Sequence, residues 1–79
     1  MKYYVVSVEQ THADEKLVEY AGAKQYETEK TALSAFYDKL ATVNKDMSET
    51  AHTFMDIKIM NSEGGITKRD TIGAYVEEV

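Results

Sequence analysis

Apolar residues recur every three or four positions between residues 28 and 46, and this spacing predicts one helix there. Thr28 is suited to cap the N-terminus by accepting a hydrogen bond from a free backbone N–H, and Glu29 suits the positive end of the helix dipole. Asn44 is a stop signal near the other end. The apolar stripe of this helix consists of Ala32, Leu33, Phe36, Leu40, Val43 and Met47.

A first strand is predicted at residues 3–9, where the side chains alternate between two faces. Both faces begin with apolar residues, so this strand is expected inside the sheet or under a partner. A polar turn at residues 11–15 leads to a weaker strand candidate at residues 16–21, and whether a strand forms there stays open. Gly22 is expected to end it, and residues 23–27 then carry the chain to the helix.

Two further strands are predicted after the helix. In residues 53–60, Thr53, Met55, Ile57 and Ile59 alternate with Phe54, Asp56, Lys58 and Met60. Residues 61–65 contain two glycines and are predicted to form a hairpin loop, because such turns need a residue with a positive φ and glycine adopts it readily. The returning strand, residues 66–72, is polar and charged as edge strands tend to be, and Gly73 is expected to bulge it.

These elements predict an α+β fold in ββαββ order, with a single helix packed on a three- to four-stranded, mainly antiparallel sheet. The 79 residues are expected to form one domain, residues 1–79. The order of the strands within the sheet stays open. A domain this small has marginal stability, and without cysteine it has neither a disulfide nor a cysteine-rich zinc site. Oligomerisation is then the natural remaining means of stabilisation.

Charge and hydropathy weigh against several kinds of partner. Nine basic and fourteen acidic residues give a formal charge of −5, which disfavours binding to a phosphate backbone. No apolar run approaches the roughly 20 residues that span a bilayer, and the N-terminal region lacks a secretory signal. Together with the absence of cysteine, these features predict a cytoplasmic protein with no membrane partner.

The chain offers few groups for metal or acid–base chemistry. His12 and His52 would need converging acids such as Asp14 or Asp56 to hold a metal, and nothing in the spacing brings them together. The adjacent acid pairs at 14–15 and 77–78 share one solvated environment, whereas acid–base catalysis needs two different environments. No residue is therefore assigned a catalytic, cofactor-binding or metal-binding role, and no enzyme activity or cofactor is expected.

Six tyrosines in so short a chain favour the core or a protein interface, and they suit an interface because one end of a tyrosine is apolar and the other stays wet. A nucleic-acid-associated regulator is the alternative, with contacts from Lys58, Lys68 and Arg69 on the C-terminal hairpin. A second alternative is an acidic mimic of nucleic acid, although bases interspersed among the acids are typical of an ordinary solvated surface. The tyrosines are Tyr3, Tyr4, Tyr20, Tyr26, Tyr37 and Tyr75.

One helix covers only part of one sheet face, so the opposite face is expected to expose apolar groups. Contiguous apolar surface of this kind marks an interface, and we predict a homodimer through it. Pairing of two sheets at their edges is the competing geometry, which the charges of residues 67–70 discourage. The predicted interface residues are Tyr3, Val5, Phe54 and Met60. The residues expected to face the core instead are Tyr4, Val6, Met55, Ile57 and Ile59.

Several segments together carry a resemblance to a group of known proteins. They are the opening KYYVV at residues 2–6, Tyr26 and Thr28 at the helix entry with Ala32 and Phe36-Tyr37, and a glycine hairpin followed by Lys68-Arg69. In these the chain resembles small uncharacterised proteins of phages and mobile elements in Gram-positive bacteria. The resemblance implies an accessory protein of the host cytoplasm that binds a larger protein, inhibiting or adapting it, and that has no catalytic residues.

Overall fold

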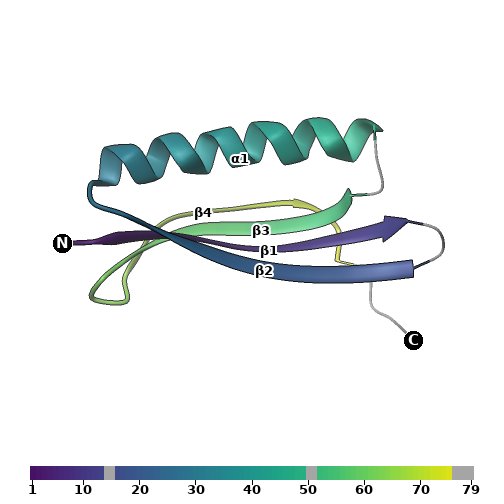
Figure 1. Ribbon diagram of the computed structural model, residues 1–79. Coiled ribbons are helices and arrows are strands. Elements are labelled where there is room, and N and C mark those ends of the chain that lie inside the picture. Colours follow the sequence, from purple (N-terminus) through teal and green to yellow (C-terminus); the bar gives the residue numbers. More distant parts are fainter. Residues whose placement is uncertain (14–15, 50–51, 76–79) are drawn as a thin grey trace.

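The computed structural model describes residues 1–13, 16–49 and 52–75, which form one helix lying on a four-stranded antiparallel sheet (Figure 1). The predicted α+β class, with a single helix packed on an antiparallel sheet, is confirmed. Along the chain the elements are β1 (Tyr3–Ala13), β2 (Lys16–Tyr26), α1 (Glu29–Glu49), β3 (His52–Asn61) and β4 (Ile66–Gly73).

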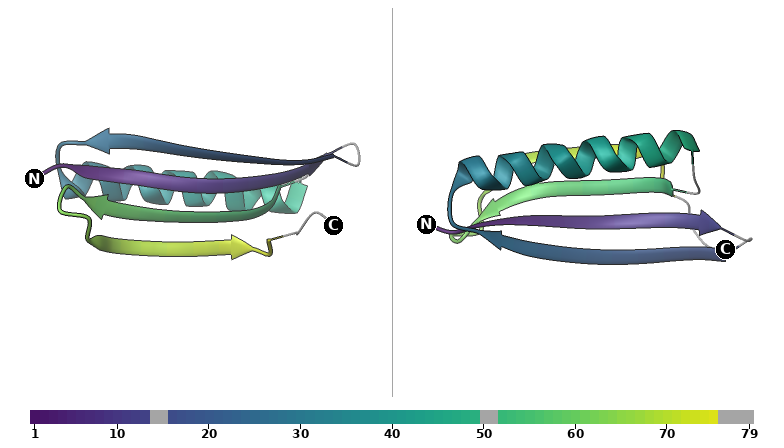
Figure 2. Two further views of the ribbon diagram at one scale, coloured as in Figure 1. Left: turned by 90° about the horizontal axis from the view of Figure 1, so that it is seen from below. Right: turned by 45° about the horizontal axis from the view of Figure 1, so that its top comes forward.

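Within the sheet the strands lie in the order β2-β1-β3-β4, so the first and third strands are central (Figure 2). The predictions that β1 lies inside the sheet and that β4 lies at its edge are confirmed. Seen through the sheet, α1 lies behind β1 and β3, whereas β2 and β4 extend beyond it on either side (Figure 2, left).

β2 is a full strand, and the prediction that Gly22 ends it was wrong. Gly22 pairs with Ser7, and the β1–β2 register runs without interruption from Tyr3 opposite Tyr26 to Ala13 opposite Lys16. Pairing along eleven residues of β1 outweighs the weak strand preference of one glycine. Strand structure also enters the predicted turn, since β1 continues to Ala13, and positions 14 and 15 lie outside the described residues.

The helix begins as predicted, with Thr28 as its cap. The backbone N–H of Thr31 donates to Thr28 Oγ1 over 3.2 Å, which satisfies one of the free donors at the helix start. The helix continues to Glu49, so Asn44 does not end it. The reason is packing, because Val43 is buried and Met47, beyond the expected stop, still packs against the core.

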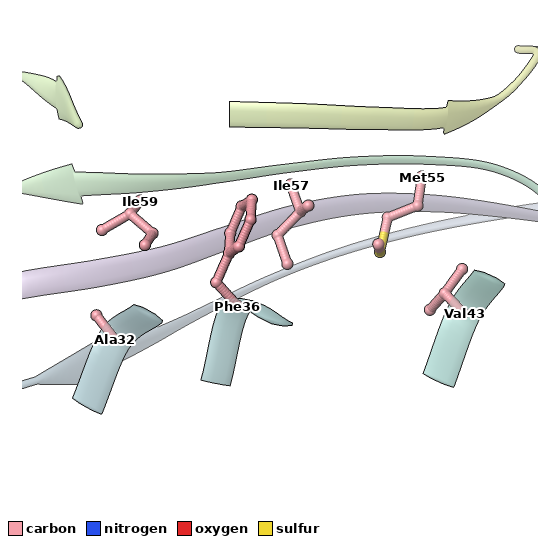
Figure 3. Packing of buried hydrophobic residues seen from close by; sticks show 6 residues of the cluster. All are labelled: Ala32, Phe36, Val43, Met55, Ile57 and Ile59. Carbon is pink, nitrogen blue, oxygen red and sulfur yellow. The ribbon is translucent and has the colours of Figure 1, made fainter. Parts of the chain in front are cut away.

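The core lies between α1 and β3, where six apolar side chains interlock (Figure 3). The predicted helix stripe is confirmed, with Leu33, Leu40 and Met47 partly buried at its margins. Burial of one such large side chain contributes about 1.5–3 kcal/mol. The fully enclosed members are Ala32, Phe36, Val43, Met55, Ile57 and Ile59.

The faces of β1 are the reverse of the prediction. Val5 lies opposite Ile59, so Tyr3 and Val5 face the helix and pack against the core, while Tyr4 lies opposite Met60 on the other side. The error has a physical cause. The face with Tyr4 is the more apolar, but the helix side accepts the carboxylate of Glu9 because Lys39 of α1 pairs with it, Nζ to Oε2, over 3.0 Å.

The C-terminal hairpin turns through the predicted loop. Asn61 Oδ1 accepts hydrogen bonds from the backbone N–H groups of Glu63 and Gly65, and Gly64 supplies a positive φ of 86°. The register shift in this hairpin lies between Ile59 and Met60, not at Gly73. Gly73 instead ends β4 with a φ of 75°, after which the Ala74 N–H donates to the carbonyl oxygen of Thr53 over 3.0 Å.

Candidate functional site: the open face of the sheet

The side of the sheet turned away from α1 is here called the open face. Strand alternation and register fix which residues lie on it. From β2 and β1 they are Leu17, Glu19, Ala21, Ala23, Gln25, Tyr4, Val6, Val8, Gln10 and His12. From β3 and β4 they are Phe54, Asp56, Lys58, Met60, Ile66, Arg69 and Thr71.

An apolar strip runs along the middle of the open face. Tyr4, Val6 and Val8 follow one another on β1, and the small side chains of Ala21 and Ala23 flank them on β2. All five are at least partly exposed, and no second layer of described residues covers them. A contiguous apolar surface of this kind is typical of a binding site.

One side of the open face is charged. Arg69 donates to both carboxylate oxygens of Asp56, Nε to Oδ1 over 3.1 Å and Nη2 to Oδ2 over 3.0 Å, and the Thr71 hydroxyl donates to Oδ1 over 3.0 Å. The hydrogen bond from Arg69 is the main cause that lowers the pKa of Asp56 below its ordinary value, and the same bond raises the pKa of Arg69. The guanidinium is thereby committed to a partner within the chain.

Tyr75 closes one end of the open face. Its ring stands edge-on to Phe54 of β3, with 5.3 Å between the ring centroids, and its hydroxyl donates to Glu19 Oε2 of β2 over 2.7 Å. Gln10 of β1 lies between Phe54 and Glu19 in the register, so the tyrosine passes over it. This explains why Gln10 is only 1% exposed on a face that is otherwise open.

The predicted nucleic-acid residues do not form one patch. Lys58 and Arg69 lie on the open face, where Asp56 holds Arg69. Lys68 points to the helix side, with its Nζ 5.4 Å from the centre of the Tyr37 ring. The interaction with Tyr37 raises the pKa of Lys68, so this lysine stays charged but is turned away from the other two.

Two shallow grooves follow α1, one beside each edge strand. The groove beside β2 has a volume of about 280 Å³ and the groove beside β4 about 380 Å³. Among the described residues, Asp70 in the groove beside β4 is the one carboxylate that lines either groove, so neither groove brings two carboxylates together. The first groove includes Lys39, whose charge is matched by Glu9.

Within the described residues, the histidines do not form a metal site. Over residues 1–13, 16–49 and 52–75, no three histidine or acidic side chains gather closely enough to hold a metal ion. His12 is exposed near the end of β1, the side chain of His52 lies outside the description, and Asp56 is occupied by Arg69. Gly64 and Gly65 lie in a hairpin between two strands, which is not the setting of a phosphate-binding loop.

Comparison with known proteins adds no family to this geometry. No protein-family model, no curated protein and no solved structure matches the chain. Among the described residues, no helix combines the length and the apolar character that a membrane crossing requires.

The structure keeps half of the predicted interface on the open face. Phe54 and Met60 lie there as predicted, whereas Tyr3 and Val5 lie under the helix. Sequence reasoning missed the β1 strip and the role of Tyr75. The apolar alternation of Tyr4, Val6 and Val8 was visible, but the sequence prediction assigned Tyr4 and Val6 to the core.

Proposed function

We propose that the protein is a non-catalytic protein-binding module that acts through the open face and associates with a second copy of itself. Its biological role would be that of an accessory or inhibitor protein of the phage or mobile-element kind, working in the cytoplasm. The observation that carries the proposal is the uncovered apolar strip of Tyr4, Val6 and Val8, flanked by Ala21 and Ala23.

The make-up of the open face supports a protein as the ligand. An apolar centre with a polar rim is the usual anatomy of a reversible protein interface. Here the rim consists of the Asp56–Arg69 pair with Lys58 on one side and Gln25 on the other. The partner is then a protein surface with a flat apolar centre and polar groups around it.

The nucleic-acid alternative has less support. The chain carries a net charge of −5, and the three basic residues that would contact nucleic acid lie on two different faces, one of them bound to Asp56. An acidic mimic of nucleic acid would need dense, unpaired acids, but Glu9, Asp56 and Glu19 are each bound to a group of the chain. Neither alternative uses the apolar strip.

The proposal is tested by capturing partners from an extract of the native host, once with the unaltered protein and once with a variant that carries a single lysine on the strip. Val6→Lys places a charge in the middle of the open face, and Ser34→Lys places the same charge on the exposed outer side of α1 as the matched control. Partners of the open face should be held by the unaltered protein and by Ser34→Lys, and lost with Val6→Lys. Thermal unfolding must show that both variants remain folded.

Salt and charge reversal separate the protein partner from nucleic acid. Captured proteins should withstand about 0.5 M salt, whereas binding to a phosphate backbone falls steeply over that range. Binding that disappears with salt and with Lys68→Glu plus Arg69→Glu, but survives Val6→Lys, would overturn the proposal in favour of nucleic acid.

A further inference from the structure

β2 is an edge strand with an unpaired outer side. It is eleven residues long and, within the described residues, β1 is its one neighbour. It carries no proline, and its pairing with β1 has no bulge, so the outer backbone N–H and C=O groups form a long regular row. Such a row is a template for pairing with another strand unless something blocks it.

We propose that two copies of the protein join through β2, which pairs antiparallel with β2 of the second copy. The two four-stranded sheets then become one sheet of eight strands. This inference rests on the self-association in the proposed function and replaces the predicted face-to-face dimer with pairing at an edge. Strand addition at a free edge is a common mode of association, because the backbone hydrogen bonds supply much of the contact.

The other edge of the sheet is protected. β4 is interrupted by the register shift after Ile59, and Lys68, Arg69 and Asp70 place charges along its middle. Residues opposite each other in a sheet share a face, so the two-fold axis of such a pair passes midway between the two copies of one residue, which lie directly opposite each other. For β4 the central choices are Arg69 and Asp70, and each would set like charges directly opposite each other.

The register of a β2 pair follows from its length. Full overlap of the eleven residues puts the two-fold axis at Ala21, the middle residue, and brings Tyr20 of one copy opposite Gly22 of the other. No charged residue then lies opposite another charged residue. The other pairs are Lys16 with Tyr26, Leu17 with Gln25, Val18 with Lys24, and Glu19 with Ala23.

Neither the backbone conformation of Gly22 nor its described surroundings in the single chain require glycine at this position. Its φ lies outside the positive range that favours glycine, and a Cβ added to it would meet no atom of the described residues within 4 Å. A glycine in the interior of a strand weakens the strand, and it often marks the close approach of another group. The space beside Gly22 belongs to the groove of about 280 Å³ between β2 and α1.

Tyr20 is the residue that a second copy would bring to that space. It lies on the helix side of β2, like Gly22, and is 44% exposed, with Val18 also exposed on the same side. In the single chain its hydroxyl donates to Thr11 Oγ1 of β1 over 3.1 Å, a contact that it must leave to enter the groove of the other copy. In the full-overlap register, Tyr20 of each copy lies beside the groove at Gly22 of the other copy. The same contact therefore forms twice about the axis, as a symmetric dimer requires.

The β2 dimer leaves the proposed binding surface free. An axis perpendicular to the sheet keeps both helices on one side and joins the two open faces on the other. Each dimer then presents two apolar strips to partners, so dimer formation and partner binding can be broken independently.

Disulfide trapping tests the register, because the chain contains no cysteine of its own. In Ala21→Cys the two thiols would be directly opposite, with Cα atoms about 4.5–5.5 Å apart, within reach of a disulfide. Ala23→Cys is the matched control on the same strand and face. Its two copies would be four residues out of step, about 13 Å apart along the strands, and should not cross-link.

Mild oxidation at tens of micromolar protein should thus give a covalent dimer with Ala21→Cys and little with Ala23→Cys. Equal cross-linking of the two variants, or none in either, would overturn the proposed pairing. Light scattering of the unaltered protein supplies the second criterion. If the mass is still that of a single chain at about 100 μM protein, the dissociation constant is weaker than that of most specific dimers, and the proposed pairing is overturned.

Two double variants test the contact between Tyr20 and Gly22. Tyr20→Lys with Gly22→Lys sets lysine opposite lysine twice, and should weaken the dimer about tenfold or more. Tyr20→Glu with Gly22→Lys sets opposite charges in the same places, and should keep the dimer within a few-fold of the original. Equal effects of the two double variants would contradict the register.

Val6→Lys separates this inference from the proposed function. It should leave the dimer mass unchanged while abolishing capture of partners. Suppose instead that Val6→Lys dissociates the dimer and the double variant Tyr20→Lys with Gly22→Lys does not. The dimer then forms through the open face and the β2 inference fails, while binding at the open face stands.

Discussion

The Tyr75 hydroxyl donates to Glu19 Oε2 over 2.7 Å, although the two residues are 56 positions apart in the chain. The contact ties the segment after β4 to β2, the strand at the opposite edge of the sheet. Between them Tyr75 lies against Phe54 and over Gln10, whose amide oxygen accepts a hydrogen bond from the Thr53 hydroxyl over 3.0 Å. The Tyr75 side chain therefore reaches from Phe54 of β3 to Glu19 of β2 and covers the buried side chain of Gln10.

Removal of the Tyr75 hydroxyl and removal of its ring should have separate effects on stability. Tyr75→Phe keeps the ring against Phe54 and should lower the free energy of unfolding by about 0.5–1 kcal/mol, because the lost hydrogen bond is partly exposed. Tyr75→Ala also loses the ring pair, a further loss of about 1 kcal/mol. Urea unfolding measures both. Two variants of equal stability would show that the ring does not pack on the sheet.

The helix cap gives a second prediction. Thr28→Ala removes the acceptor for the Thr31 N–H and should lower the free energy of unfolding by about 1 kcal/mol. Thr28→Ser keeps the hydroxyl and is the matched control, expected to stay within a few tenths of a kcal/mol of the unaltered protein. Thermal or urea unfolding would contradict the assignment of the cap if alanine and serine behaved alike.

The ion pair on the open face should make stability depend on pH. The folded pKa of Asp56 lies below the ordinary value of 3.8, chiefly through the hydrogen bond from Arg69. A lowered carboxyl pKa contributes stability above the ordinary value, and this contribution is lost as the pH falls through the folded pKa. Asp56→Asn should therefore be less stable than the unaltered protein at pH 7, and the gap should narrow as the pH falls from about 5 to 2.

Arg69→Gln is the control for this pH dependence. Alone, it should remove most of the same acid-sensitive stability, because Arg69 supplies two of the hydrogen bonds to the carboxylate. In the Asp56→Asn background it should add no further change with pH. A pH profile of Asp56→Asn parallel to that of the unaltered protein would show that the pair does not form in solution.

Local features of the sequence predicted the parts of the fold that depend on neighbours in the chain. The α1 stripe, the Thr28 cap and the loop at residues 61–65 follow from spacing, side-chain chemistry and glycine φ, all within a few positions. The end of the helix was misplaced, because packing of Met47 on the sheet, a contact with distant strands, extends it beyond Asn44.

The errors concern contacts between distant segments. Gly22 appeared to break β2, but Ser7 lies opposite it in a continuous ladder. The two faces of β1 were exchanged because the face with Tyr4 is the more apolar, whereas Lys39 on the helix makes burial of Glu9 on the other face acceptable. For the same reason Tyr75 could not be placed from the sequence, since Phe54 and Glu19 reach it only in the folded chain.

Two glycines of the sheet should respond to alanine in opposite ways. Gly73 has a φ of 75°, and an added Cβ would collide with the carbonyl oxygen of Thr53, so Gly73→Ala should lower the free energy of unfolding by about 1–3 kcal/mol. Gly22 has an ordinary φ and open space beside it, so Gly22→Ala should raise the free energy of unfolding by about 0.4–1 kcal/mol, because alanine lowers the conformational entropy of the unfolded chain. Urea unfolding at a protein concentration low enough to keep the chain monomeric measures both without a contribution from dimer formation. Destabilisation by Gly22→Ala under that condition would mean that the glycine serves the fold of the single chain, and would remove the reason to look for a neighbour beside it.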